Sequence, residues 1–268
     1  MGFEPLTISV MHDTVEVVHS NILEVIMKVM FLVLSGGKGT RLRPATFFRQ
    51  KTLLPAMNSR KILDYAIESG DVQGISGVEA KTVVLARYKS RQVTHYVQER
   101  YPDVSVLVES AAFDTGGAVL QHWQIVCEYA PDIVIVLNGD HLVRLPVQDL
   151  LRHYKERNTP ALLMVGIHSD EAHHDYLDVR FDSEKILHKF SHRKSRVAYT
   201  GIPIFRFDAL KERMDQLPIG AYNMTKDIVE WVYAKHGGEC YILRNEWDDL
   251  GTWKRYLGFL FREFRTSG

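Results

Sequence analysis

Short blocks of consecutive apolar residues alternate along the chain with segments in which apolar residues recur every three or four positions. The first block runs from Met30 to Leu34 and stops at glycines, which is typical of a strand buried on both faces. Further strands are expected at residues 81–86, 104–109, 132–137, 160–167 and 239–243. Segments with helical spacing are residues 61–68, 89–100, 115–128, 147–157, 208–214, 223–235 and 252–264. Because strands and helices alternate, the sequence predicts an α/β fold with a Rossmann-like, mostly parallel sheet that carries helices on both faces.

This alternation is interrupted in the second half of the chain. Three strands are expected at residues 177–181, 186–190 and 197–205, with little helix between them. Strands that follow one another through short connections pair antiparallel. The sequence therefore predicts a small antiparallel lobe attached to the parallel sheet.

The composition is that of an ordinary globular protein and excludes several classes. Apolar residues make up 46% and charged residues 25% of the 268 residues. The 33 basic and 33 acidic side chains balance, so no overall charge favours nucleic acid or an anionic membrane as a partner. No apolar run is long enough to span a membrane, and Cys127 and Cys240 have no zinc-site spacing. We therefore expect a cytoplasmic protein that recognises charged ligands through local clusters of charge.

A glycine-rich, basic loop follows the first strand directly. Glycine lets the backbone turn sharply and bring its N–H groups close to a ligand, and the cations of this stretch suit phosphate. A Walker loop is excluded because the first glycine of that motif is missing, and a dinucleotide fingerprint is excluded because its third glycine is missing. The alternative is a strand-to-helix turn with a solvated basic edge. The residues of the loop are Ser35, Gly36, Gly37, Lys38, Gly39, Thr40 and Arg41.

The stretch from Gly36 to Pro55 resembles the signature of the sugar-1-phosphate nucleotidylyltransferases, and most of all the guanylyltransferases for mannose or heptose 1-phosphate. That signature reads GG-x-GTRL-x-P-x-T, then a lysine and a later proline, and the chain matches it without gaps. The resemblance implies a glycosyltransferase-A-like nucleotidyltransferase fold. It also implies an enzyme that joins an NTP and a sugar 1-phosphate into an NDP-sugar and releases pyrophosphate. By the same resemblance, Leu34 to Thr40 bind the nucleotide, Arg41 contacts the triphosphate, and Lys51 acts at the reacting phosphates.

Two acidic residues stand where the family holds a metal ion. Asp140 directly follows an expected strand, and Asp249 lies in a W-x-D-x-G-T segment. The resemblance implies that both bind Mg²⁺, an ion that needs only a few carboxylates when phosphate oxygens and waters complete its coordination. On the residues alone, Asp140 would also suit a turn and Asp249 a helix cap, and Asp248 is the fallback for the second ligand.

The segment from Glu109 to Ala118 resembles the part of the family that reads the nucleotide base. We expect Glu109, Asp114, Thr115, Gly116 and Gly117 to bind the nucleotide. The two glycines would let a flat base approach the backbone, and the Glu109 carboxylate could accept from guanine N1–H and N2–H, which favours GTP. Asp114 stands where relatives commonly have glycine. The alternative is a plain glycine-opened helix start.

The resemblance weakens in the half of the chain that would bind the sugar phosphate. Relatives carry F-x-E-K-P, whereas this chain has F-S-H-R-K, so that His192 and Arg193 replace the glutamate and the lysine. Arg193 can still bind phosphate, but His192 cannot replace a carboxylate. Thr200 and Gly201 lie in a segment that resembles the family's N-A-G-I. We expect these four residues to contact the sugar phosphate.

The resemblance covers roughly residues 27–265 and suggests one domain, 27–268. We divide it into a nucleotide-binding half (about 27–145) and a sugar-phosphate-binding half (about 146–268), preceded by an N-terminal extension of residues 1–26. The expected partners are the two small-molecule substrates, with no nucleic acid and no membrane, and a homo-oligomer is compatible with the sequence.

Two other functions stay open at this point. One is a cytidylyltransferase that acts on a non-sugar phosphate such as phosphocholine. The other is a non-catalytic subunit that senses a nucleotide-sugar. A glycosyltransferase of related fold is not expected, because Asn138-Gly139-Asp140 lacks the first acid of an Asp-x-Asp motif.

Overall fold

The computed structural model describes residues 26–167, 178–181, 187–191, 197–243 and 247–266. Its centre is a path of seven strands within a larger sheet, and each strand of this path is parallel to its neighbours apart from β9 (Val197–Arg206), which is antiparallel to both β4 and β6. The α/β class and the mostly parallel sheet are therefore confirmed. The strands, in spatial order, are β10 (Glu239–Leu243), β6 (Ala161–Ile167), β9, β4 (Ile133–Asn138), β1 (Met27–Ser35), β2 (Val78–Ala86) and β3 (Ser105–Val108).

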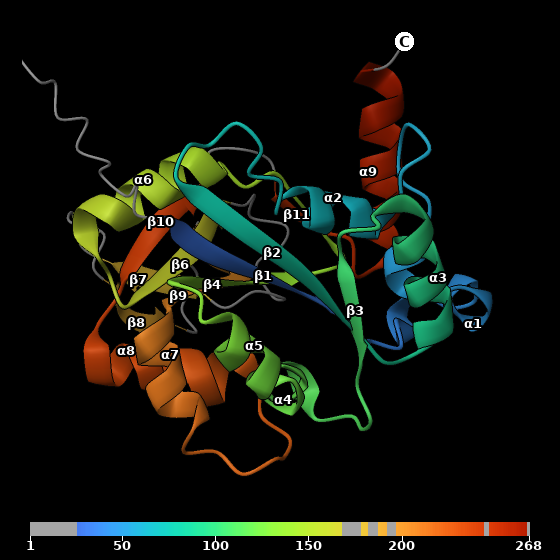
Figure 1. Ribbon diagram of the computed structural model, residues 1–268. Coiled ribbons are helices and arrows are strands. Elements are labelled where there is room, and N and C mark those ends of the chain that lie inside the picture. Colours follow the sequence, from blue (N-terminus) through green and yellow to red (C-terminus); the bar gives the residue numbers. More distant parts are fainter. Residues whose placement is uncertain (1–25, 168–177, 182–186, 192–196, 244–246, 267–268) are drawn as a thin grey trace, which may run out of the picture.

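Helices cover both faces of this sheet because successive side chains of a strand point to opposite sides. On β1, Met30 and Leu32 pack on one face, whereas Val29, Phe31 and Val33 pack on the other. Figure 1 shows α4 (Asp114–Gln121), α5 (Trp123–Tyr129), α7 (Phe207–Met214) and α8 (Glu230–His236) below the sheet, in the first of these layers. The second layer contains α2 (Ile62–Glu68), α3 (Ser90–Arg100) and α6 (Val147–Arg157).

The expected antiparallel lobe is present at one side of the sheet. Strand β7 (Asp178–Phe181) pairs antiparallel with β8 (Leu187–Ser191), and it also pairs antiparallel with β9. The sequence did not predict a second antiparallel feature, the ribbon of β5 (His141–Val143) and β11 (Trp247–Asp249). Each of its strands is too short to produce a recognisable apolar pattern.

Two expected helices differ from the observed ones. The helix expected at 115–128 is divided at His122, whose ψ of 17° is not helical, and the new direction lets the Trp123 Nε1–H donate to Asp215 Oδ1 at 2.9 Å. The helix expected at 223–235 begins as a π-helical segment, Met224–Val229, and continues as α8. A tertiary contact lies at this start too, because the Met224 N–H donates to Thr115 Oγ1 at 2.9 Å.

A third apolar cluster fixes the last helix, α9 (Trp253–Thr266), against the region that follows β1. Leu42 and Leu54 of that region, Leu142 of β5 and Leu250 after β11 are buried in it together with Tyr256 of α9. Segments from both ends of the described chain thus meet at one place. Within the part of the chain that the structure describes, no helix is long and apolar enough to cross a bilayer.

Candidate active site

The glycine loop after β1 is held in place by polar contacts from the segment that follows it. Gln50 Nε2 donates to the carbonyl oxygens of Ser35 at 2.9 Å and Gly37 at 3.4 Å. The Ser35 and Thr52 hydroxyls are hydrogen-bonded at 2.8 Å. Gly39 has a φ of 62°, in the left-handed region that favours glycine. Gln50 was missed in the sequence, because the family signature gives no role to that position.

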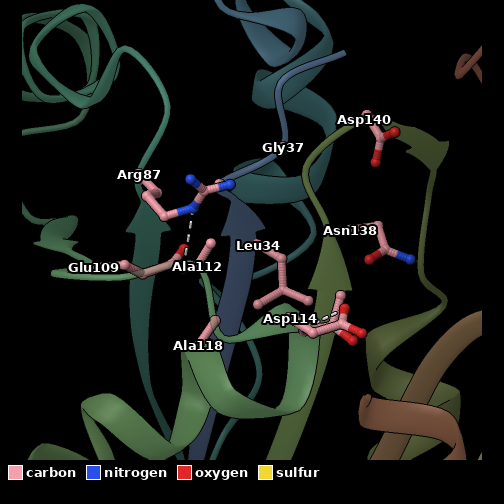
Figure 2. A pocket seen from close by; sticks show the side chains of 11 residues that line it. Leu34, Gly37, Arg87, Glu109, Ala112, Asp114, Ala118, Asn138 and Asp140 are labelled. Atoms are coloured by element: carbon pink, nitrogen blue, oxygen red, sulfur yellow. Dashed lines mark hydrogen bonds and ion pairs between the residues drawn. The ribbon is translucent and has the colours of Figure 1, made fainter. Parts of the chain in front are cut away.

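A pocket of about 250 Å³ opens beside this loop, at the carboxyl ends of β1 and β4 (Figure 2). Ligands in open α/β sheets bind at such strand ends. Figure 2 shows Leu34 at the centre of the pocket, with Arg87 and Glu109 at one end and Asp140 at the other. The lining residues are Leu34, Gly36, Gly37, Arg87, Glu109, Ala112, Asp114, Thr115, Ala118, Asn138 and Asp140.

Glu109 forms the buried end of the pocket. Its side chain is only 5% exposed, and its Oε2 lies 3.9 Å from Arg87 Nε. Burial raises the pKa of Glu109, and the nearby Arg87 guanidinium partly offsets that effect. The carboxylate also lies against Gly36, where a Cβ atom would be 2.5 Å from Glu109 Oε1. The absence of a side chain at Gly36 is therefore needed for the position of Glu109.

This contact gives a prediction for stability. Gly36→Ala should lower the free energy of unfolding by about 1–3 kcal/mol, because the new methyl group must displace a nearly buried carboxylate. Gly37→Ala is the matched control, since a Cβ at Gly37 would meet nothing within 4 Å, and it should change stability by less than about 0.5 kcal/mol. Urea unfolding followed by circular dichroism measures both. Equal stability of the two variants would contradict the observed packing of Glu109 on Gly36.

The expected nucleotide residues at the start of α4 fall into two groups. Asp114 and Thr115 line the pocket, with Asp114 exposed and in the left-handed region at a φ of 59°. Gly116 and Gly117 do not line the pocket, and both of their N–H groups donate to the carbonyl oxygen of Tyr222, at 2.7 and 3.0 Å. A Cβ at Gly117 would lie 2.3 Å from the Gly220 carbonyl oxygen. Close packing against the backbone around Tyr222 thus explains why these two positions are glycine. This explanation differs from the expected one, in which the glycines let a base approach.

The β5–β11 ribbon brings the two expected metal ligands together. Asp249 is directly opposite His141 in the antiparallel pair, and the Leu250 N–H donates to the Asp140 carbonyl oxygen at 3.3 Å. As a result, ligand atoms of Asp140, His141 and Asp249 all lie within 4.8 Å of one another. Asp248 is not part of this cluster, because successive residues of a strand point to opposite faces. Its carboxylate forms an ion pair with Arg262 instead.

A cationic side chain lies next to each of the two carboxylates, Asp140 and Asp249, and offsets part of its negative charge. The Lys51 ammonium contacts Asp140 Oδ2 directly, and Arg255 Nη1 donates to Asp249 Oδ2 at 2.8 Å. Burial alone would raise the pKa of Asp140, but Lys51 and His141 outweigh burial, so the pKa of this carboxyl group lies below its usual value. Asp140 is therefore anionic at neutral pH. Asp249 Oδ1 also accepts the Gly251 N–H at 2.6 Å, just before α9, so this residue makes a local backbone contact as well as facing the cluster.

His141 is a site residue that the sequence analysis missed. It is buried, and its Nδ1 accepts a hydrogen bond from Trp247 Nε1 at 3.3 Å. In a neutral imidazole this bond places the proton on Nε2. His141 is thus the third member of the cluster with Asp140 and Asp249. The sequence signal for His141 was its position next to Asp140. This signal points to the site only when the pairing of His141 with Asp249 in the β5–β11 ribbon is known.

The basic residues of the loop lie at different distances from this cluster. Arg41 lies beside Gly251, two residues after Asp249, since a Cβ on Gly251 would be 3.0 Å from Arg41 Nη2. Lys38 and Thr40 are exposed and do not line the pocket. Gly39 packs closely against Lys51, since a Cβ atom on Gly39 would lie 2.8 Å from Lys51 Cβ.

The expected sugar-phosphate residues are only partly assembled. Thr200 is 1% exposed, and its hydroxyl donates to the Met164 carbonyl oxygen at 2.8 Å within the sheet. Thr200 is therefore not directed to the pocket. Gly201 backs the pocket wall, because its carbonyl oxygen accepts from Asn138 Nδ2 at 3.4 Å. His192 and Arg193 lie outside the described residues.

Comparison with known proteins gives the family of this chain. A family model described as "Nucleotidyl transferase" matches residues 30–260. The chain belongs to the nucleotidyl transferase family.

Among curated members, it is 24% identical to a glucose-1-phosphate adenylyltransferase of Clostridium novyi (strain NT), over 84% of this chain and 64% of that protein. It is 26% identical to a protein of the same name from Acetivibrio thermocellus, over 85% of this chain and 58% of that one. The chain thus spans less than two thirds of the length of these relatives.

Two solved structures share the fold of this nucleotidyl transferase. A protein from Bacillus anthracis described as a glucose-1-phosphate thymidylyltransferase, in complex with a sucrose, superposes with a TM-score of 0.72 and 18% identity, over 87% of this chain and 94% of that one. HddC from Yersinia pseudotuberculosis, complexed with GMP-PN, has a TM-score of 0.66 and 17% identity, over 87% of this chain and 99% of that one. At these identities the likeness supports the fold, and the expected nucleotidyltransferase fold class is confirmed.

Proposed function

We propose that this chain transfers a nucleoside monophosphate from an NTP to a sugar 1-phosphate and releases pyrophosphate. One observation carries the proposal. Asp140 and Asp249 are far apart in the sequence, yet the β5–β11 ribbon brings them within 4.8 Å at the end of the glycine-loop pocket, next to Lys51. A binding module for a neutral sugar would need neither the paired carboxylates nor the cations.

The chemistry of this donor set fits Mg²⁺. Two carboxylates, one of which lines the pocket, leave room for phosphate oxygens and waters in the coordination sphere, as Mg²⁺ prefers. Asp140 and Asp249 would hold the ion. When bound, Mg²⁺ would neutralise charge on the phosphates at the reacting centre.

The residues of the chain then provide positioning and charge. The sugar phosphate already carries its nucleophilic oxygen as an anion, so no general base is needed. This oxygen forms a new bond to the α-phosphorus of the NTP while the bond from that phosphorus to the pyrophosphate oxygen breaks. Lys51 and Arg41 would stabilise the negative charge of the transfer, and the loop around Gly36 and Gly37 would orient the triphosphate.

The pocket suggests a direction for the bound nucleotide. Its triphosphate would lie toward Asp140 and its base toward Glu109 and Arg87, with Asp114 and Thr115 along the wall. The Glu109 carboxylate suits guanine N1–H and N2–H, so we propose GTP as the first NTP to test. The curated relatives are named as adenylyltransferases, which makes ATP the main competitor.

We further propose that residues 27–145 form the nucleotide half, that residues 146–268 form the sugar-phosphate half, and that the reaction takes place in the cytoplasm.

A grid of NTPs against sugar 1-phosphates, with pyrophosphate release measured in the presence of Mg²⁺, tests the proposal. We expect release for at least one pair, with GTP or ATP and a hexose or heptose 1-phosphate. Phosphocholine with CTP belongs in the grid as the main alternative. No release from any pair, together with tight binding of an NDP-sugar, would instead support a sensing subunit.

A further inference from the structure

The second carboxylate of the site is held by an arginine from α9. We propose that Arg255 is a positioning residue, which fixes the Asp249 carboxylate in the orientation that lets it share a divalent cation with Asp140. The inference rests on the proposed metal-dependent function. It concerns a residue in the first turn of α9, outside the segments that the family signature covers.

The contacts of Asp249 carry this assignment. Its Oδ1 accepts the Gly251 N–H at 2.6 Å, and its Oδ2 accepts from Arg255 Nη1 at 2.8 Å. Both side chains of the Arg255–Asp249 pair are only 15% exposed. A carboxylate that is bonded at both oxygens cannot rotate freely. Each oxygen can accept more than one partner, so both remain able to bind a cation on the side of Asp140.

Charge gives a second reason for an arginine at this position. Asp140 and Asp249 have ligand atoms within 4.8 Å of each other, and like charges at this distance repel. The positive charge of Lys51 offsets the negative charge of Asp140, and that of Arg255, on α9, offsets the negative charge of Asp249. Without Arg255, Asp249 would lose the bond at Oδ2 and could turn this oxygen away from Asp140. Groups that orient a metal ligand in this way typically change metal affinity by about 10- to 100-fold.

The chain contains its own control for this arrangement. The same helix supplies Arg262 to the neighbouring acid, Asp248, and this pair is largely solvated, with side chains 58% and 32% exposed. The two pairs combine the same residue types, the same strand and the same helix. Only the Arg255–Asp249 pair lies at the cluster with Asp140. A general role in fastening α9 to β11 would apply to both arginines, whereas a role at the metal site applies to Arg255 alone.

Mn²⁺ binding to the full chain without substrates tests the inference, with free Mn²⁺ measured by electron paramagnetic resonance. We expect Arg255→Met to weaken Mn²⁺ binding about 10- to 100-fold. Arg262→Met should bind Mn²⁺ as the wild type does. Arg255→Lys, which keeps the charge but not the planar fork, should fall between the two and should be the variant used if Arg255→Met does not fold.

Three outcomes separate the inference from the proposed function. If Arg255→Met binds Mn²⁺ as tightly as the wild type while Asp249→Asn binds it poorly, Arg255 is only a structural tether and the inference is wrong. If Arg255→Met binds Mn²⁺ more tightly, Arg255 competes with the metal, which also overturns it. If Asp249→Asn binds like the wild type, the proposed metal site itself fails, and the role of Arg255 fails with it.

Discussion

Asp140→Asn should lower kcat by at least about 10²- to 10³-fold and leave the fold intact. The substitution preserves the size of the side chain but removes the negative charge that would hold the metal and that attracts Lys51. A loss of this size is typical when one preorganised electrostatic group is removed from an active site. The kcat of pyrophosphate release at saturating NTP and sugar phosphate measures the effect, and circular dichroism checks the fold.

Asp248→Asn is the matched control, because this acid lies on the same strand as Asp249 but pairs with Arg262 outside the cluster. It should keep the wild-type kcat. A near-normal kcat in Asp140→Asn would contradict the assignment of Asp140 as a metal ligand.

Lys51→Met should lower kcat by about 10²- to 10³-fold, with a smaller effect on the KM for the NTP. Lys51 is nearly buried, and its ammonium contacts the Asp140 carboxylate at the end of the pocket. If its charge acts on the phosphates during transfer, its loss affects the transition state more than it affects substrate binding. Initial rates over a range of NTP concentrations separate the two parameters.

Lys155→Met provides the control for Lys51, since Lys155 is an exposed residue in the last turn of α6. Its kinetics should not change. If Lys51→Met instead raised only the KM and kept the wild-type kcat, Lys51 would contribute to substrate binding alone.

Much of the fold could be predicted from the sequence because its elements produce strong local patterns. Strand β1 is a continuous apolar block, and all of its residues from Val29 to Val33 are buried. The alternation of such blocks with helical segments was sufficient to give a mostly parallel sheet. Asp140 could be placed at the end of β4 for the same reason, since a strand of apolar residues ends just before it.

The assembly of the site depends on contacts that local patterns do not contain. The hydrogen bond between Trp247 and His141 joins residues 106 positions apart, on two strands of three residues each. No periodicity over such short segments reveals the pairing. The sequence therefore suggested a shared metal site for Asp140 and Asp249 only through the family resemblance, and it gave no indication of His141 or Arg255.

Two other expectations show why residue type is not sufficient. Thr200 and Gly201 are neighbours on β9, and a strand directs successive side chains to opposite faces. Sequence could not tell which of them faces the pocket, and the Thr200 hydroxyl is used inside the sheet. Gly116 and Gly117 suggested an approach of the base, but the close backbone around Tyr222 is what requires glycine there.

The most direct test of the account is product analysis with the best substrate pair from the grid of NTPs and sugar 1-phosphates. After removal of metal by EDTA, the enzyme should form no product, and addition of Mg²⁺ should restore the reaction. We predict one molecule of NDP-sugar for each pyrophosphate released, in the wild type but not in Asp140→Asn or Asp249→Asn. Pyrophosphate or phosphate release without NDP-sugar, or equal product formation by either aspartate variant, would contradict transfer at the Asp140–Asp249 site.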